Sequence, residues 1–348
     1  MEVMDLEGNN EPGHKRSDLD KIAGGSGDAK SLRGGDHAID MDDDDEEVFD
    51  IYVKNWIFMY GGWAKFDEPN GPMLPMFPEP MDTMEIFVVK VAQIAGGLEW
   101  PLQVYGDVAV RDSLDQKRNY LFRRGRDDCQ ALTSPQIELN SFFSENSHVQ
   151  DSLLELTGPS RAVILLDNPV FEIDLKVKGE EESEDNVLCY KYFGYDNLAY
   201  RGADSYARTE MLSSKNRAIE VRFAHVTCSL EATISIQMTT GSGNFWARLT
   251  ACTASIGEKV VLLDTGGREV SVAEDGKVYL QRRVVVVEEQ GKLILGFEAA
   301  QLGGDSAESS ITTAKEMTFP ARCALRSESY FVIGPTRLHV VVAWSLLP

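Results

Sequence analysis

The chain has 348 residues, of which 43% are hydrophobic, and a formal net charge of −22. This length fits one or two domains, and the hydrophobic fraction is enough to build a sizeable core. The strong negative charge disfavours binding to nucleic acid or to an anionic membrane surface through bulk electrostatics.

The start of the chain and its cysteines indicate where the protein resides. The first residues have neither the basic start nor the apolar stretch of a secretory signal. No apolar run approaches the ~20 residues needed to cross a bilayer. The five cysteines form no CxxC motif and have no histidines at metal-ligand spacing, so neither a disulfide framework nor a metal site is predicted. We expect a cytoplasmic or nuclear protein that is not secreted, has no membrane span and carries no cofactor.

Residues 1–47 form an acidic leader. The first 50 residues carry 5 basic and 16 acidic side chains, which is half of the net charge of the chain. A segment this poor in aromatic residues cannot bury enough apolar surface to offset its chain entropy, so disorder is predicted. The acidic run 42–47 lacks the turn glycine and the ligand spacing of an EF-hand loop, which favours a solvated tail over a calcium site.

Aromatic residues and prolines interleave between residues 48 and 83. This composition predicts an extended strap that lies on the domain and contains no regular helix. The aromatic side chains are interpreted as covers for the edges of a core.

From residue 84 to the end, apolar residues recur at every second position. The clearest alternating runs are 171–177, 232–238 and 338–344. Such alternation places one face of a strand in the core and the other in water; Glu172, for example, is assigned to the wet face. No long segment has the helical period. The expected fold is therefore all-β, an antiparallel β-sandwich over 84–348.

An internal repeat is visible in the same region. Residues 89–104 match residues 221–236 in both apolar and charged positions, including a shared Leu-Glu pair at Leu98 and Leu230. We interpret this as two tandem related β units, 84–180 and 218–345.

Several stretches carry a resemblance to a known family, and they lie at 85–112, 118–133, 153–178, 261–264, 280–296 and 343–347. Over about residues 50–348 the chain resembles the grass family called domain of unknown function 6598. This family has no assigned catalytic residues. Similar plant domains sit beside, or are fused to, ribosome-inactivating N-glycosylase domains of the jasmonate-induced type. The resemblance thus implies a stress or defence setting by association alone.

The chain departs from the family pattern at residues 137–150. This segment, IELNSFFSENSHVQ, separates two stretches that are continuous in the family. Its flanking glutamines suggest an alternative splice junction. Since loops tolerate insertions at small cost, only the local loop is affected.

No convincing catalytic constellation is found. An N-glycosylase of the ribosome-inactivating class needs a glutamate and an arginine on one helix, but Glu231-Ala232 and Glu298-Ala299 have no arginine at that spacing and lie in predicted strands. A serine hydrolase elbow is absent. His225 and His339 fall in strands, where a hydrogen-bonded structural histidine is the usual finding.

The one basic cluster follows a predicted strand and contains Lys117, Arg118, Arg123, Arg124 and Arg126, interleaved with tyrosine and phenylalanine. Arginine beside aromatic rings can contact anions, including RNA phosphates. The alternative is a solvated hairpin whose arginines pair with nearby aspartates, and the alternating charges favour it.

The sequence therefore favours a non-catalytic all-β interaction or regulatory module with an unknown protein partner. An RNA N-glycosylase activity, and a sandwich that binds carbohydrate or a lipid surface, stay open as alternatives. Neither the ligand nor the oligomeric state follows from the sequence.

Overall fold

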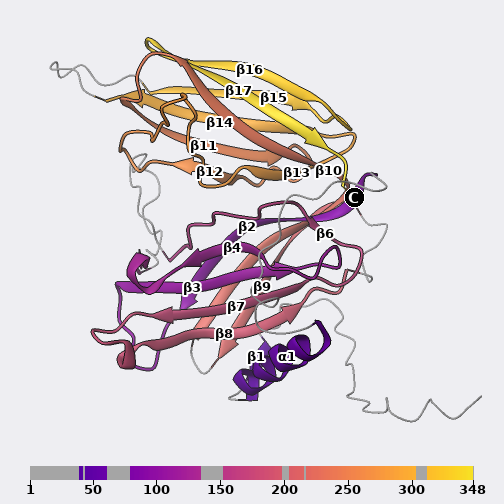
Figure 1. Cartoon of the computed structure of the whole chain (residues 1–348), viewed down its shortest axis with the longest axis vertical. Coiled ribbons are helices and arrows are strands. Elements are labelled where there is room, and N and C mark those ends of the chain that lie inside the picture. Colours follow the sequence, from indigo (N-terminus) through magenta and orange to yellow (C-terminus); the bar gives the residue numbers. More distant parts are fainter. Residues whose placement is uncertain are drawn as a thin grey trace, which may run out of the picture. The chain divides into compact units, whose positions relative to one another are not determined.

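Two antiparallel β-sandwiches follow one another along the chain (Figure 1). The computed structural model describes residues 39–41, 44–60, 79–134, 152–197, 204–214, 217–302 and 312–347. Most of the predicted leader 1–47, residues 61–78 of the predicted strap and all of 137–150 lie outside the described residues. The prediction of an all-β fold with antiparallel sandwich architecture is confirmed.

The strands of the first sandwich are β2 (Met81–Gln93), β3 (Leu102–Arg111), β4 (Asn119–Arg124), β5 (Gln130–Leu132), β6 (Val163–Ile164), β7 (Val170–Val177), β8 (Asn186–Gly194), β9 (Tyr206–Ser214) and the first half of β10 (Arg217–Thr240). One sheet has the order β9-β10-β2-β6 and the facing sheet the order β4-β3-β7-β8. β5 also pairs with β3, and the short β1 (Ile39–Met41) pairs in parallel with β9. Two single-turn 3₁₀ helices, Arg126–Asp128 and Glu182–Glu184, lie in the connections.

The second sandwich is built from the remainder of β10, β11 (Phe245–Thr253), β12 (Val260–Asp264), β13 (Val284–Glu288), β14 (Lys292–Gln301), β15 (Thr313–Pro320), β16 (Arg326–Ile333) and β17 (Thr336–Ser345). One sheet has the order β16-β17-β10-β13 and the other the order β12-β11-β14-β15.

The two sandwiches have the same topology. In each, the first strand pairs with the fourth and with the last, and the second strand pairs with the third and with the fifth. By this correspondence β2 is equivalent to the second half of β10, and β3 is equivalent to β11. The chain therefore contains two tandem related β units.

The residue correspondence inferred from the sequence is nevertheless wrong. Val89 does not occupy a position equivalent to Val221, because the two residues face each other as antiparallel neighbours in one sheet. The match between 89–104 and 221–236 thus reflects the common alternation of paired strands. Leu98 lies in the loop between β2 and β3, whereas Leu230 lies inside β10.

The two units meet inside β10, which differs from the expected limits of 180 and 218. The first half of this 24-residue strand pairs with β2 and β9, and the second half pairs with β13 and β17. Cys228 marks the passage, with a φ of 43° and an irregularity in the register. Residues 181–226, including β8 and β9, therefore complete the first sandwich.

Side chains at alternate positions fill two large cores, one in each sandwich. Ile173 and Leu175 of β7 are buried in the first core, and Ile234 and Ile236 of β10 are buried in the second, as the alternation predicts. Glu172 is an exception, since it is only 2% exposed although it points away from the first core.

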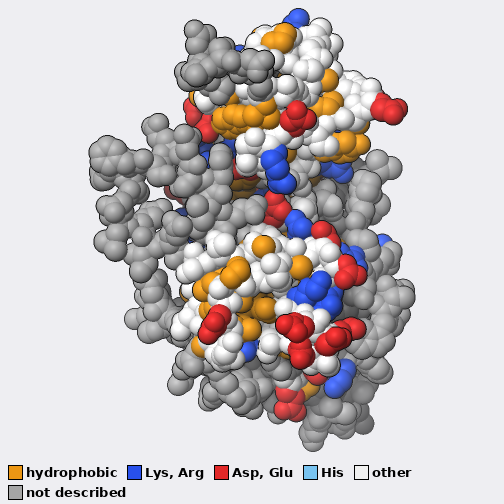
Figure 2. Space-filling model, turned by 90° about the vertical axis from the view of Figure 1, so that its left-hand side faces the viewer, with side chains coloured by type: hydrophobic (Ala, Val, Ile, Leu, Met, Phe, Trp, Pro, Cys, Tyr) orange, Lys and Arg blue, Asp and Glu red, His pale blue; other side chains and the backbone are white. Residues whose placement is uncertain are grey.

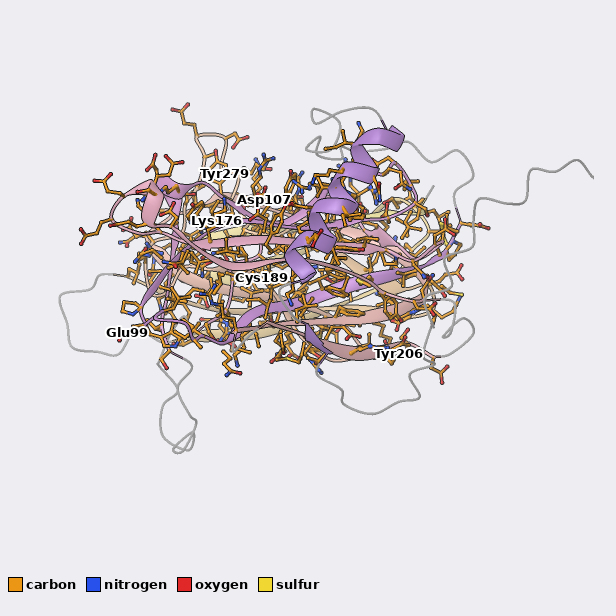
Figure 3. The ribbon with its side chains drawn as sticks, turned by 90° about the horizontal axis from the view of Figure 1, so that it is seen from below. Glu99, Asp107, Lys176, Cys189, Tyr206 and Tyr279 are labelled. Carbon is orange, nitrogen blue, oxygen red and sulfur yellow. The ribbon has the colours of Figure 1, made fainter. Side chains whose placement is uncertain are left out.

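The structure corrects the absence of a helix predicted for residues 48–83. Helix α1 spans Asp44–Tyr60 and thus begins inside the predicted leader. Phe49, Val53 and Trp56 recur at helical spacing and are buried together with Tyr190 and Tyr192 of β8. The helix covers part of the outer face of the β4-β3-β7-β8 sheet, and these contacts with distant residues stabilise it. Figure 3 shows α1 crossing the strands obliquely.

Candidate binding groove

A hollow of about 580 Å³ lies between elements of the two sandwiches. Its size is within the range of small-molecule binding sites. The first sandwich contributes Phe87 and Val88 of β2, Gln130 of β5 and the segment 153–156. The second contributes side chains on β11 and β12 and in the loops around 266 and 281.

The first wall is an extension of the β2 sheet. The Val91 amide donates to the Ser152 carbonyl at 2.8 Å, and the Leu154 amide donates to the Val89 carbonyl at 2.8 Å. This strand-like pairing buries Leu154 and leaves Leu153 42% exposed beside the groove. The first wall therefore presents apolar surface to a ligand.

Glu155 is the polar centre of the groove. Its carboxylate accepts from Arg124 Nη2 at 2.6 Å and from Gln281 Nε2 at 2.7 Å. The side-chain oxygen of Gln281 in turn accepts from the Asp264 amide at 3.0 Å. Gln130 holds the Glu155 backbone through a 2.9 Å hydrogen bond. This network runs from one sandwich to the other and fixes the two walls against each other.

Three cationic side chains line the second wall. Arg248 lies 3.5 Å from Asp264, and Lys259 lies 3.7 Å from Glu316; both pairs are solvated, so each contributes little. Arg268 donates to the Thr265 carbonyl at 3.3 Å and, among the described residues, forms no ion pair with a carboxylate. The second wall therefore attracts an anion.

A buried ion pair lies at the base of the groove. Arg282 donates to the Glu85 carboxylate and to the Ile86 carbonyl, and Glu85 also accepts from the Val286 amide at 2.8 Å. Burial raises the pKa of Glu85 and lowers the pKa of Arg282, while their mutual attraction acts in the opposite direction on each. Because Arg282 is already neutralised, the charge it offers a ligand is small.

The structure separates the four arginines of the predicted anion contact. Arg124 reaches the groove, but only as the partner of Glu155. Arg118 is buried against Glu172 at 2.6 Å, and Arg126 pairs with Asp185 at 2.8 Å. These pairings agree with the alternative of arginines that neutralise the chain's own acids, and the anion contact stays a prediction.

Arg123 is the most exposed of the four. It lies 3.6 Å from Asp107, and its guanidinium lies over the Tyr120 ring at 4.4 Å. Figure 3 labels Asp107 and, near it, Lys176 of β7. Basic and acidic side chains are also interspersed on the face shown in Figure 2. On that face no single charge dominates.

The two strand histidines have structural partners. His225 is fully buried, with Nδ1 3.1 Å from the Tyr195 hydroxyl and Nε2 3.1 Å from Asp82. His339 stacks on Tyr330 and lies 3.1 Å from Glu328.

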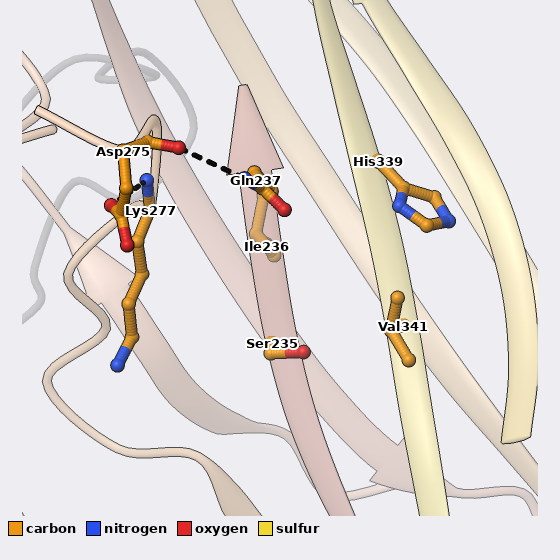
Figure 4. Close-up of a pocket in the computed structure, with 7 residues that line it drawn as sticks. All are labelled: Ser235, Ile236, Gln237, Asp275, Lys277, His339 and Val341. Carbon is orange, nitrogen blue, oxygen red and sulfur yellow. Dashed lines mark hydrogen bonds between the residues drawn. The ribbon is translucent and has the colours of Figure 1, made fainter. Parts of the chain in front are cut away.

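His339 also borders a smaller hollow of about 220 Å³. This hollow lies over β10 and β17, where the turn containing Asp275 and Lys277 approaches Gln237 (Figure 4). Gln237 donates to the Asp275 carbonyl at 2.9 Å, so part of the polar lining is already paired.

The two glutamates weighed for N-glycosylase chemistry lie on different strands. Glu231 on β10 accepts from the Ala162 amide at 2.8 Å, whereas Glu298 is exposed on β14. Within the described part of the chain, no three histidine, cysteine or acidic side chains gather as a metal site. No helix of these residues is long and apolar enough to cross a membrane.

Comparison with known proteins identifies the family. No curated protein matches the chain. Among solved structures, the chain is similar to human GIVD cytosolic phospholipase A2 at 8% identity and a TM-score of 0.23, covering 78% of this chain and 33% of that one. It is also similar to the two tandem C2 domains of extended-synaptotagmin 2 at 8% identity and a TM-score of 0.26, covering 81% of this chain and 99% of that one. This chain thus spans about a third of the phospholipase, and likenesses of this size carry no inference about function. The family model described as "Domain of unknown function (DUF6598)" matches residues 83–342, and the chain belongs to this family.

Proposed function

We propose that the protein is a non-catalytic binding module that takes an anionic, partly apolar ligand into the groove between its sandwiches. The observation that carries the proposal is the composition of the groove. Apolar side chains such as Leu153 and Val261 are exposed there beside Arg268, whose guanidinium has no carboxylate partner among the described residues. A carboxylate, sulfonate or phosphate on an apolar body satisfies both surfaces.

The rigidity of the groove supports a binding role. The Glu155 network and the Glu85–Arg282 pair hold both walls before a ligand arrives. A site that is already ordered loses less conformational entropy on binding. The lipid-binding alternative is a special case of this proposal, because a lipid with an anionic headgroup has the required chemistry.

The N-glycosylase alternative receives no comparable support. Its chemistry needs a carboxylate and a cation held together near the sugar and the departing base. Glu231 is held by a backbone amide at the junction of the sandwiches, and Glu298 is an exposed strand residue. A stress or defence role and a cytoplasmic or nuclear address remain predictions from the sequence.

The proposal is tested with 8-anilinonaphthalene-1-sulfonate, which combines a sulfonate with apolar rings. Its fluorescence reports binding to the full chain. The Arg268→Gln substitution removes a charge-assisted hydrogen bond of about 1.5–3 kcal/mol, so affinity falls about tenfold or more. The Val261→Asp substitution places a negative charge in the apolar part and has the same effect.

Arg326→Gln is the matched control, because Arg326 is an exposed arginine on β16 and does not line the groove. It should bind the probe as the wild type does. Equal affinity of the wild type, Arg268→Gln and Val261→Asp would contradict the proposal, since the probe would then bind elsewhere.

A further inference from the structure

Helix α1 covers a surface of arginines and tyrosines on the first sandwich. Arg111 of β3 and Tyr192 of β8 belong to the outer face of the β4-β3-β7-β8 sheet, which turns away from the main core. The guanidinium of Arg111 is nevertheless 2% exposed, because Trp56 of the helix lies over it at 4.4 Å. The helix thus occupies a face that otherwise offers cations and aromatic rings to solvent.

The apolar contacts of the helix are few and lie on one stripe. Phe49, Val53 and Trp56 are its buried apolar residues among those whose side chains are described. The Phe49 ring lies 4.5 Å from Tyr190, and the Tyr52 ring stacks on Tyr192 at 4.4 Å. This small third core is separate from the cores of the two sandwiches.

The polar contacts of the helix complement the charge of the sheet. The Tyr52 hydroxyl donates to Glu172 at 2.8 Å, and the Tyr190 hydroxyl donates to Asp50 at 2.9 Å. Glu172 is shared between Arg111 and Arg118, so the buried group carries one net positive charge. An acidic aromatic helix therefore fits this face in both shape and charge.

The sheet beneath the helix is complete without it. Glu172 keeps both guanidinium partners, each at 2.6 Å, and β8 pairs along its length with β7. The contacts that α1 makes with the sheet run through side chains. Loss of the helix would expose the face and leave the strands paired.

We propose that this face is a receptor for an acidic amphipathic helix of a partner protein, and that α1 is an internal ligand that keeps the receptor occupied. The partner helix presents an aromatic residue, a β-branched residue four positions later and a tryptophan three positions after that. Because α1 belongs to the same chain, its effective concentration is high, and an incoming helix has to compete with it. This interaction is independent of the groove.

The test uses the full chain and a fluorescein-labelled peptide with the sequence of residues 44–60, followed by fluorescence anisotropy. In the Phe49→Ala/Trp56→Ala variant the internal helix is released, and the peptide binds at least tenfold more tightly than it binds the wild type. The matched control is Val48→Ala/Ile51→Ala on the solvent side of the same helix, where the two side chains are 43% and 48% exposed. This control should bind the peptide as weakly as the wild type.

Two further arms make each outcome decisive. A peptide with serine at the positions of Phe49 and Trp56 should not bind the released variant. Failure of the native peptide to bind a folded released variant would overturn the proposal, as would equal binding to the wild type. Unfolding of both the double variant and Trp56→Ala would also overturn it, because α1 would then be an obligatory part of the fold. A concentration-dependent dimer of the wild type, detected by light scattering, would assign the face to a second copy of the chain and contradict the partner proposed here.

Discussion

Glu172 is the position where the structure most changes the expected effect of a substitution. The alternation in β7 places it on the wet face, where replacement should be harmless. In the structure it is 2% exposed, and Arg111 and Arg118 each donate to it at 2.6 Å. Although burial opposes the charge of Arg118, the Glu172 carboxylate raises the pKa of that arginine above its usual range. The three groups therefore depend on one another.

The Glu172→Gln substitution keeps the shape of the side chain and removes its charge. Breaking a buried ion pair by neutralising one partner costs about 3–5 kcal/mol, since the other charge remains buried. At roughly 2–4 °C per kcal/mol for domains of 150–250 residues, Tm should fall by about 10 °C. Glu172→Lys should be worse, because it adds a third cation between two guanidinium groups.

Urea unfolding followed by tryptophan fluorescence measures this loss, and Trp56 above Arg111 is a local reporter. Ser235→Lys on the exposed face of β10 is the control and should leave stability unchanged. A free energy of unfolding for Glu172→Gln within about 0.5 kcal/mol of the wild type, the range of ordinary surface substitutions, would refute the reasoning.

The remaining predictions concern one core position, one tyrosine and the thiols. Ile234→Asp should abolish cooperative unfolding, because a carboxylate in the apolar core costs several kcal/mol; a stable folded variant would show that the buried face is assigned wrongly. Tyr105 should ionise late in an ultraviolet titration, since burial and a hydrogen bond to a carboxylate raise its pKa to about 12; uniform ionisation of all tyrosines near pH 10 would contradict this. Cys228 is exposed and should react with Ellman's reagent before unfolding, whereas burial raises the pKa of Cys252 and should delay its reaction until the chain unfolds; similar native rates would count against the described burial.

The sandwich architecture was predictable because it rests on a local pattern. Alternation along β7 and β10 reads directly as one buried and one exposed face. The passage between the two units was not predictable in the same way. β10 continues through it without glycine or proline, and the change of core occurs at Cys228, an ordinary residue by sequence.

Helix α1 was missed although its apolar stripe is present in the sequence. Phe49, Val53 and Trp56 have helical spacing, but the acidic run before them and the prolines after them have the composition of a leader and a strap. The stripe becomes meaningful only when Tyr190 and Tyr192, far along the chain, supply the surface on which it is buried.

The groove could not be predicted from the sequence for a similar reason. Glu155, Gln281 and Arg268 come from separate stretches, and no linear motif links them. The arginine cluster was visible as a cluster, but its role depends on partners such as Glu172 and Asp185 that the topology brings near. Sequence proximity of like charges therefore says little about the surface they form.

The central claim is that the groove between the two sandwiches is the ligand site, and methyl NMR tests it most directly. The chain is labelled at leucine and valine methyl groups and titrated with 8-anilinonaphthalene-1-sulfonate. Because Leu153 and Val261 line the groove, their methyl signals should shift together with one saturable affinity, and Val88 should follow them. Shifts confined to exposed apolar residues of the second sandwich away from the groove, such as Leu325 and Val332, would contradict the account.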